Sequence, residues 1–194
     1  MKRRIRVTCL LLWLSLIAFV APGFAGQARP PQDSEEARDF KIFTDRVQAY
    51  VKMQKNLEAS LSTLKPTMDA AQIVIHQHAL ARKIADARRD ARQGDIFTRE
   101  VAERFRKIIR KAFHGPEGRL ARRTIHQDTP FRVPVLRVND VYPENIPLTT
   151  TPPTLLLKLP ELPPELTYRF VGRDLTLKDI KAGLIVDLIP NAIP

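Results

Sequence analysis

Apolar residues between positions 33 and 65 recur every three or four positions, which is the spacing of one face of a helix. Asp33 or Ser34 can cap its start, and Pro66 follows its end. We therefore expect a helix over 33–65 whose apolar stripe packs against another helix, either of this chain or of another copy. The stripe consists of Phe43, Val47, Tyr50, Gln54, Leu57, Leu61 and Leu64.

Similar periodic patterns predict helices over 68–92 and 98–113, and a shorter helical segment over 116–126. The alanine-rich second segment allows another helix to approach closely, and Gly115 followed by proline is a clear stop after the third. Since the connections are short, we expect antiparallel neighbours in a bundle of three to four helices over 33–126.

Residues 127–165 form a proline-rich stretch with many apolar residues. Of 16 prolines in the chain, 11 lie between Asp128 and Pro194. Proline fixes φ and removes a hydrogen-bond donor, which disfavours ordinary helix and central strand. We expect an extended strap packed on the helical part, the alternative being a semi-rigid spacer.

The last segment, 166–194, carries the clearest strand pattern of the chain. Residues 166–171, 175–177 and 184–189 are strand-like and are separated by turn residues. Three strands bury little by themselves, so this meander needs the helices or the strap on one face. The predicted fold class is α+β, mainly α: a helical bundle, a proline-rich strap and a small three-stranded antiparallel meander.

The sequence Tyr168-Arg-Phe-Val-Gly-Arg-Asp-Leu-Thr-Leu177, followed by Leu184-Ile-Val-Asp-Leu-Ile189, resembles the C-terminal meander of periplasmic proteins of the nickel/cobalt-homeostasis regulator type. Those proteins also have a Leu-Pro-rich approach, as residues 159–164 do here. Taken whole, the chain more closely resembles a family of uncharacterised secreted bacterial proteins, for which no activity is implied. These resemblances imply a location and a meander, not a metal function.

The first twenty-five residues have the pattern of a secretory signal peptide. A basic start is followed by an uncharged apolar run and then by small residues ending at Ala25. We expect cleavage after Ala25, with Ala28 as the second choice, leaving 26–32 as a flexible leader. The alternative is an uncleaved helix that anchors the chain in a membrane. The protein is therefore expected to be exported, periplasmic or extracellular.

Removal of the signal changes the available chemistry, because Cys9 is the only cysteine. The mature chain is then free of cysteine and can form neither a disulfide nor a thiolate ligand. It also loses four cations, so the net charge of the whole chain, +11, becomes about +7.

The excess of positive charge is concentrated in residues 82–123, which contain 14 basic and 6 acidic residues. Such a block can attract lipid, cell-wall polymer or nucleic acid, and it can equally be a solvated helix face. The candidate residues for an anionic surface are Arg88, Arg89, Arg92, Arg106, Lys107, Arg110, Lys111, Arg122 and Arg123.

The sequence offers no recognisable catalytic, cofactor-binding or metal-binding constellation. His76 and His78 are two positions apart, so on a helix they point in nearly opposite directions and cannot share an ion. The isolated glycines form no phosphate loop, and no serine lies in a nucleophile elbow. We therefore expect no enzyme activity, no cofactor and no metal.

These patterns favour a non-catalytic secreted or periplasmic protein that interacts with protein partners, or with itself, in the cell envelope. The alternative function is electrostatic binding of anionic surfaces through the basic block, with nucleic acid disfavoured. Contact with a membrane is expected only through the signal segment, if it is not cleaved.

Overall fold

The structure is a computed structural model that describes residues 32–64, 67–127, 135–142 and 151–193. The expected signal peptide and nearly all of the expected leader lie outside this part of the chain. Residues 31–194 belong to one compact unit. Among the described helices, none has the length and apolarity needed to span a bilayer.

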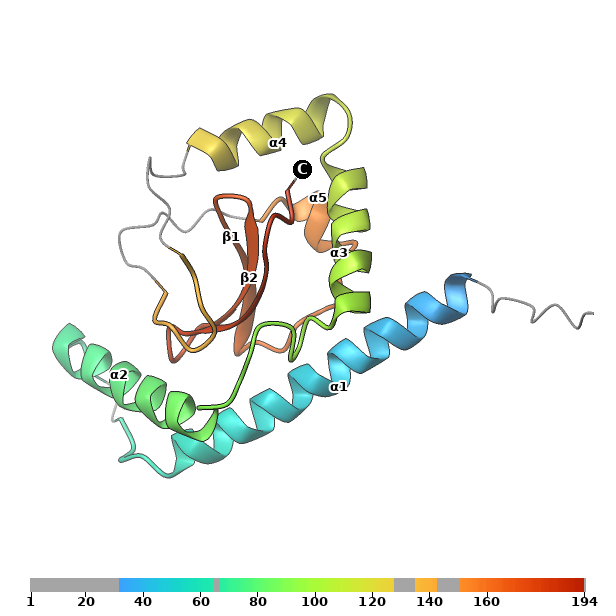
Figure 1. The fold of residues 1–194 in the computed structure, drawn as a ribbon. Helices are drawn as coiled ribbons and strands as arrows, with labels where there is room; N and C mark the ends of the chain where they lie inside the picture. Colours follow the sequence, from blue (N-terminus) through green and yellow to red (C-terminus); the bar gives the residue numbers. More distant parts are fainter. Residues whose placement is uncertain (1–31, 65–66, 128–134, 143–150, 194) are drawn as a thin grey trace, which may run out of the picture. The chain divides into compact units, whose positions relative to one another are not determined.

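Four helices lie in the predicted regions, and Figure 1 shows how they follow one another. The first ends at Ala59 rather than at 65, so Leu61 and Leu64 of the predicted stripe lie beyond it, and the second ends at Ala87 rather than at 92. A fifth, α5, is a single turn within the strap, where Pro153 takes a first-turn position that needs no backbone donor. The helices are α1 Gln32–Ala59, α2 Ala70–Ala87, α3 Arg99–Ala112, α4 Pro116–Gln127 and α5 Pro153–Leu156.

The ends of the helices follow from local side-chain chemistry. Asp69 caps α2 by accepting a hydrogen bond from the amide of Ala71, and Thr98, the predicted cap, accepts one from Val101 at the start of α3. Gly115 has a φ of 92° after α3, a conformation that glycine adopts without strain.

The C-terminal meander has strand order β1-β2-β3, with both pairs antiparallel. The strands are β1 Leu166–Val171, β2 Asp174–Asp179 and β3 Ile185–Ile189. A two-residue turn joins the first pair, and a bulge between Leu177 and Lys178 interrupts the second. The predicted α+β, mainly α fold class is confirmed.

One aromatic cluster joins α1, α3 and β1. Phe105 of α3 is fully buried, and its ring centroid lies 5.3 Å from that of Phe43 and 5.8 Å from that of Tyr168. Phe97 lies 5.1 Å from it in an edge-on arrangement. The apolar stripe of α1 is thus buried by this chain itself from Phe43 to Gln54.

The described parts of the strap are packed rather than free. Residues 135–142 lie along β3, where the amide of Asn139 donates to Ile185 and that of Tyr142 donates to Gly183. The second part, 151–165, contributes Leu155 and Leu159 to the main core. The strap therefore covers the sheet edge as well as the helices.

Candidate binding cleft

A cleft of about 700 Å³ lies where the end of α1, the first half of α2 and the turn after β2 meet. Its size falls within the range of ligand and peptide sites. Apolar side chains form much of its lining, and charged groups come from α1 and the turn. The lining residues are Lys55, Glu58, Ala59, Leu61, Thr63, Leu64, Ile73, His76, Gln77, Leu80, Ile180 and Lys181.

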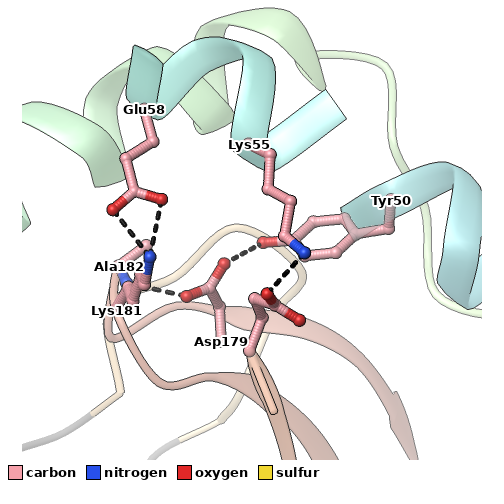
Figure 2. A network of polar contacts seen from close by, with 7 residues as sticks. Tyr50, Lys55, Glu58, Asp179, Lys181 and Ala182 are labelled. Carbon is pink, nitrogen blue, oxygen red and sulfur yellow. Dashed lines mark hydrogen bonds and ion pairs between the residues drawn. The ribbon is translucent and has the colours of Figure 1, made fainter. Parts of the chain in front are cut away.

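A buried hydrogen bond fixes α1 to the turn beneath this cleft. Figure 2 shows Tyr50 pointing from α1 toward Asp179, the last residue of β2, and the Tyr50 hydroxyl donates to Asp179 Oδ2 at 2.7 Å. The other carboxylate oxygen accepts from the amide of Ala182, also at 2.7 Å. Asp179 therefore shapes the turn and positions the helix at once.

Two ion pairs lie beside this bond, and both are internal to the chain. Lys55 Nζ is 2.8 Å from Glu165 Oε1. Lys181 Nζ is 2.8 Å from both carboxylate oxygens of Glu58, as Figure 2 shows. The hydrogen bond from Lys55 lowers the pKa of Glu165. Because the lysines are about half exposed, each pair contributes only about 0–1 kcal/mol to stability. The main effect of the two ion pairs is that the positive charge of each lysine is balanced by a carboxylate, so the pairs add no net charge to the rim of the cleft.

Burial governs the titration of the Tyr50–Asp179 pair. It raises the pKa of Tyr50 above its ordinary value, and the negative charge of Asp179 raises it further, so the hydroxyl keeps the proton that it donates. Burial also raises the pKa of Asp179, and the hydrogen bonds from Ala182 and Tyr50 offset only part of this effect.

This pair makes stability depend on pH. The folded protein keeps a proton on Asp179 to a higher pH than the unfolded chain does. Its contribution is therefore complete below the ordinary aspartate pKa and is lost as pH rises through the raised folded value. We expect the difference in unfolding free energy between wild type and Asp179→Asn to move in favour of the variant as pH increases. Urea unfolding from about pH 4 to about pH 7 measures this difference, and a constant difference would contradict it.

Beside the cleft, large apolar side chains are exposed to solvent. We call these five residues the apolar tip: Leu64, Met68, Ile73, Val74 and Ile75. Ile75 is 66% exposed and Met68 is fully exposed. A second hollow of about 500 Å³ adjoins the cleft and includes Ile75 and His76 in its lining. Exposed apolar groups gathered at a hollow are typical of an interaction site.

The candidate anionic-surface residues have different environments. Arg88 is half-buried, and its guanidinium donates to the Asn139 side chain and to the Val186 carbonyl, both at 3.1 Å. Arg106 donates to the carbonyl of Pro190. Both therefore fasten helices to the strap or to the C-terminal segment, a role that charge counting does not distinguish from an exposed cation.

The remaining candidates have no side-chain hydrogen bond or ion pair within the described ranges. Lys107, Arg110 and Lys111 lie at spacings of three and four and share an exposed face of α3. Arg122 and Arg123 continue the positive charge onto α4, while Arg89 and Arg92 both follow the end of α2. The structure therefore brings the cations of α3 and α4 into consecutive elements and separates Arg88 from them.

Metal ligands do not gather among the described residues: no group of three His, Cys, Asp or Glu side chains could hold an ion. His76 lines the cleft, whereas His78 is exposed on another face of α2.

No family model, curated protein or solved structure matches the chain.

The cleft itself was not predicted from the sequence. It is built from residues 55–64, 73–80 and 180–181, which are far apart along the chain. The one signal that could have indicated it is the uncharged run from Ala70 to Ala81, which is more apolar than one buried helix face requires.

Proposed function

We propose that the chain is a non-catalytic exported protein that binds a protein partner in the cell envelope through the cleft and the apolar tip. The observation that carries this proposal is the occurrence of five exposed apolar side chains within residues 64–75, of which Leu64 and Ile73 line the cleft. Exposed large apolar side chains gathered in one short segment are costly in water, and binding sites are where proteins retain them.

The chemistry of the cleft supports binding rather than catalysis. Both carboxylate oxygens of Asp179 and of Glu58 accept hydrogen bonds from their own chain, and Glu165 is buried and does not line the cleft. A general acid or base has to reach a substrate, whereas these carboxylates are engaged within the chain or buried away from the cleft. The apolar lining of the cleft can exclude water from the contact with a partner, and such desolvated contacts carry much of the binding energy of protein interfaces.

The test compares the native mass of complexes in envelope extracts of producing cells. We expect the wild-type protein to migrate as a complex heavier than the single chain. The Ile75→Glu variant should migrate at the mass of the single chain, because a charge buried in an apolar contact opposes binding. Leu157→Glu is the matched control, since Leu157 is 88% exposed on α5's flank, outside the tip. Equal complexes for all three proteins would contradict the proposal.

A second candidate function rests on the free cations of α3 and α4. Lys107, Arg110, Lys111, Arg122 and Arg123 are not used in internal side-chain contacts within the described part. Such a set favours electrostatic binding of an anionic lipid or cell-wall polymer.

Binding to anionic vesicles at low and high salt tests this second function. We expect affinity that falls steeply with salt and that is lost when Lys107, Arg110 and Lys111 are changed to glutamine. Arg99→Gln is the control, because Arg99 is already paired with Glu103. Vesicle binding independent of salt, or absent at low salt, would rule it out.

A further inference from the structure

The surface around the apolar tip carries little net charge, unlike most of this chain. Residues 64–81 contain one cation, Lys65, and one anion, Asp69, whose formal charges cancel, and the rim lysines are paired with Glu165 and Glu58. The chain as a whole carries +11, with its basic excess in residues 82–123. Two copies would repel one another through the basic block, so a neutral face is where they could meet.

The shape of this face is a projection beside two hollows. Ile73 lines the cleft, and Ile75 lines the second hollow, while Leu61, Thr63, Leu64 and His76 line both. Successive residues of a helix point about 100° apart, so Ile73 and Ile75 point about 200° apart. A flat partner would cover one of them and leave the other in water, whereas a partner that itself has a projection and a hollow can cover both.

We propose that the occupant of this face is a second copy of the chain. In this dimer the apolar tip of one copy packs against the cleft of the other, and a twofold axis makes the contact reciprocal. The inference rests on the proposed function and names its partner. The same surface supplies both the apolar tip and the cleft, so each copy covers the apolar side chains that the other copy leaves exposed.

A charged or lipid partner fits this face less well. Interfacial membrane binding by an apolar helix end uses free cations around it. Here Lys55 and Lys181, the two lysines that line the cleft, are ion-paired with Glu165 and Glu58. The rim therefore provides little attraction for anionic headgroups.

Sedimentation velocity of the protein purified from the envelope of producing cells, over a concentration series, tests the dimer. We expect wild type to pass from one to two chains as concentration rises, and Ile75→Glu to raise the dissociation constant at least about tenfold. Val74→Glu should have the same direction of effect, and Leu157→Glu should leave the dissociation constant unchanged. Far-ultraviolet circular dichroism and thermal melting of each variant establish that it is folded.

A wild-type chain that stays monomeric at every concentration would overturn the dimer. If that monomer still enters heavier complexes in envelope extracts through Ile75, the proposed function holds with a different protein as the partner. If the monomer instead floats with neutral lipid vesicles in an Ile75-dependent way, the occupant is lipid. A dimer that Ile75→Glu and Val74→Glu leave intact would place the contact elsewhere and overturn the inference equally.

Discussion

Replacing Asp187 with alanine is expected to destabilise the protein by about 4 kcal/mol or more, because it removes a charged acceptor from several buried donors at once. Asp187 lies fully buried in β3. Its carboxylate accepts hydrogen bonds from the amides of Gly94, Ile96 and Phe97 at 2.8–3.0 Å. The loop between α2 and α3 is held to the sheet by these bonds. Urea unfolding measures the loss.

Two further variants separate this effect from simple loss of a carboxylate. Asp187→Asn retains one acceptor oxygen and should lose about half as much free energy as the alanine variant. Asp174→Ala is the surface control, since Asp174 accepts from the exposed amide of Asn191, and we expect a loss of about 1 kcal/mol or less. A loss under about 1 kcal/mol for Asp187→Ala would contradict the role of this carboxylate in holding the loop.

Phe105→Ala is expected to cost about 3–5 kcal/mol, the usual range for removing a fully buried phenylalanine. Its ring contacts those of Phe40, Phe43, Phe97 and Tyr168, so its removal leaves a cavity where α1, α3 and β1 meet. Thermal or urea unfolding measures the effect.

The matched control for this core substitution is Leu157→Ala, because Leu157 is largely exposed. We expect its effect to stay within about 0.5 kcal/mol. If the two variants were equally stable, the aromatic cluster would not be the centre of the fold.

Periodicity predicted the elements of this chain well, and it could do so because the patterns are local. The helices around Phe43 and Phe105 and the strands of the meander bury one face each, which leaves a three-to-four or alternating pattern in the sequence. The partner of the α1 stripe could not be predicted, because a heptad pattern is the same whether the other helix belongs to this chain or to another.

The role of Asp187 illustrates what local patterns miss. In the sequence it is one acidic residue within an apolar strand, and the loop that it binds lies about ninety positions earlier. Arg88 was grouped with exposed cations for the same reason, since Asn139 and Val186, its acceptors, come from distant segments. The cleft likewise exists only once three separate segments meet. Long-range contacts of this kind leave no periodic signal.

We propose that this protein binds another protein through the apolar tip. Photo-crosslinking in producing cells tests this contact, with a photoreactive amino acid placed at Ile75 or, as the control, at Leu157. We expect a discrete adduct from position 75 and none from position 157, whether the captured chain is a second copy or a different protein. Absence of an adduct at position 75, or identical adducts from both positions, would contradict it.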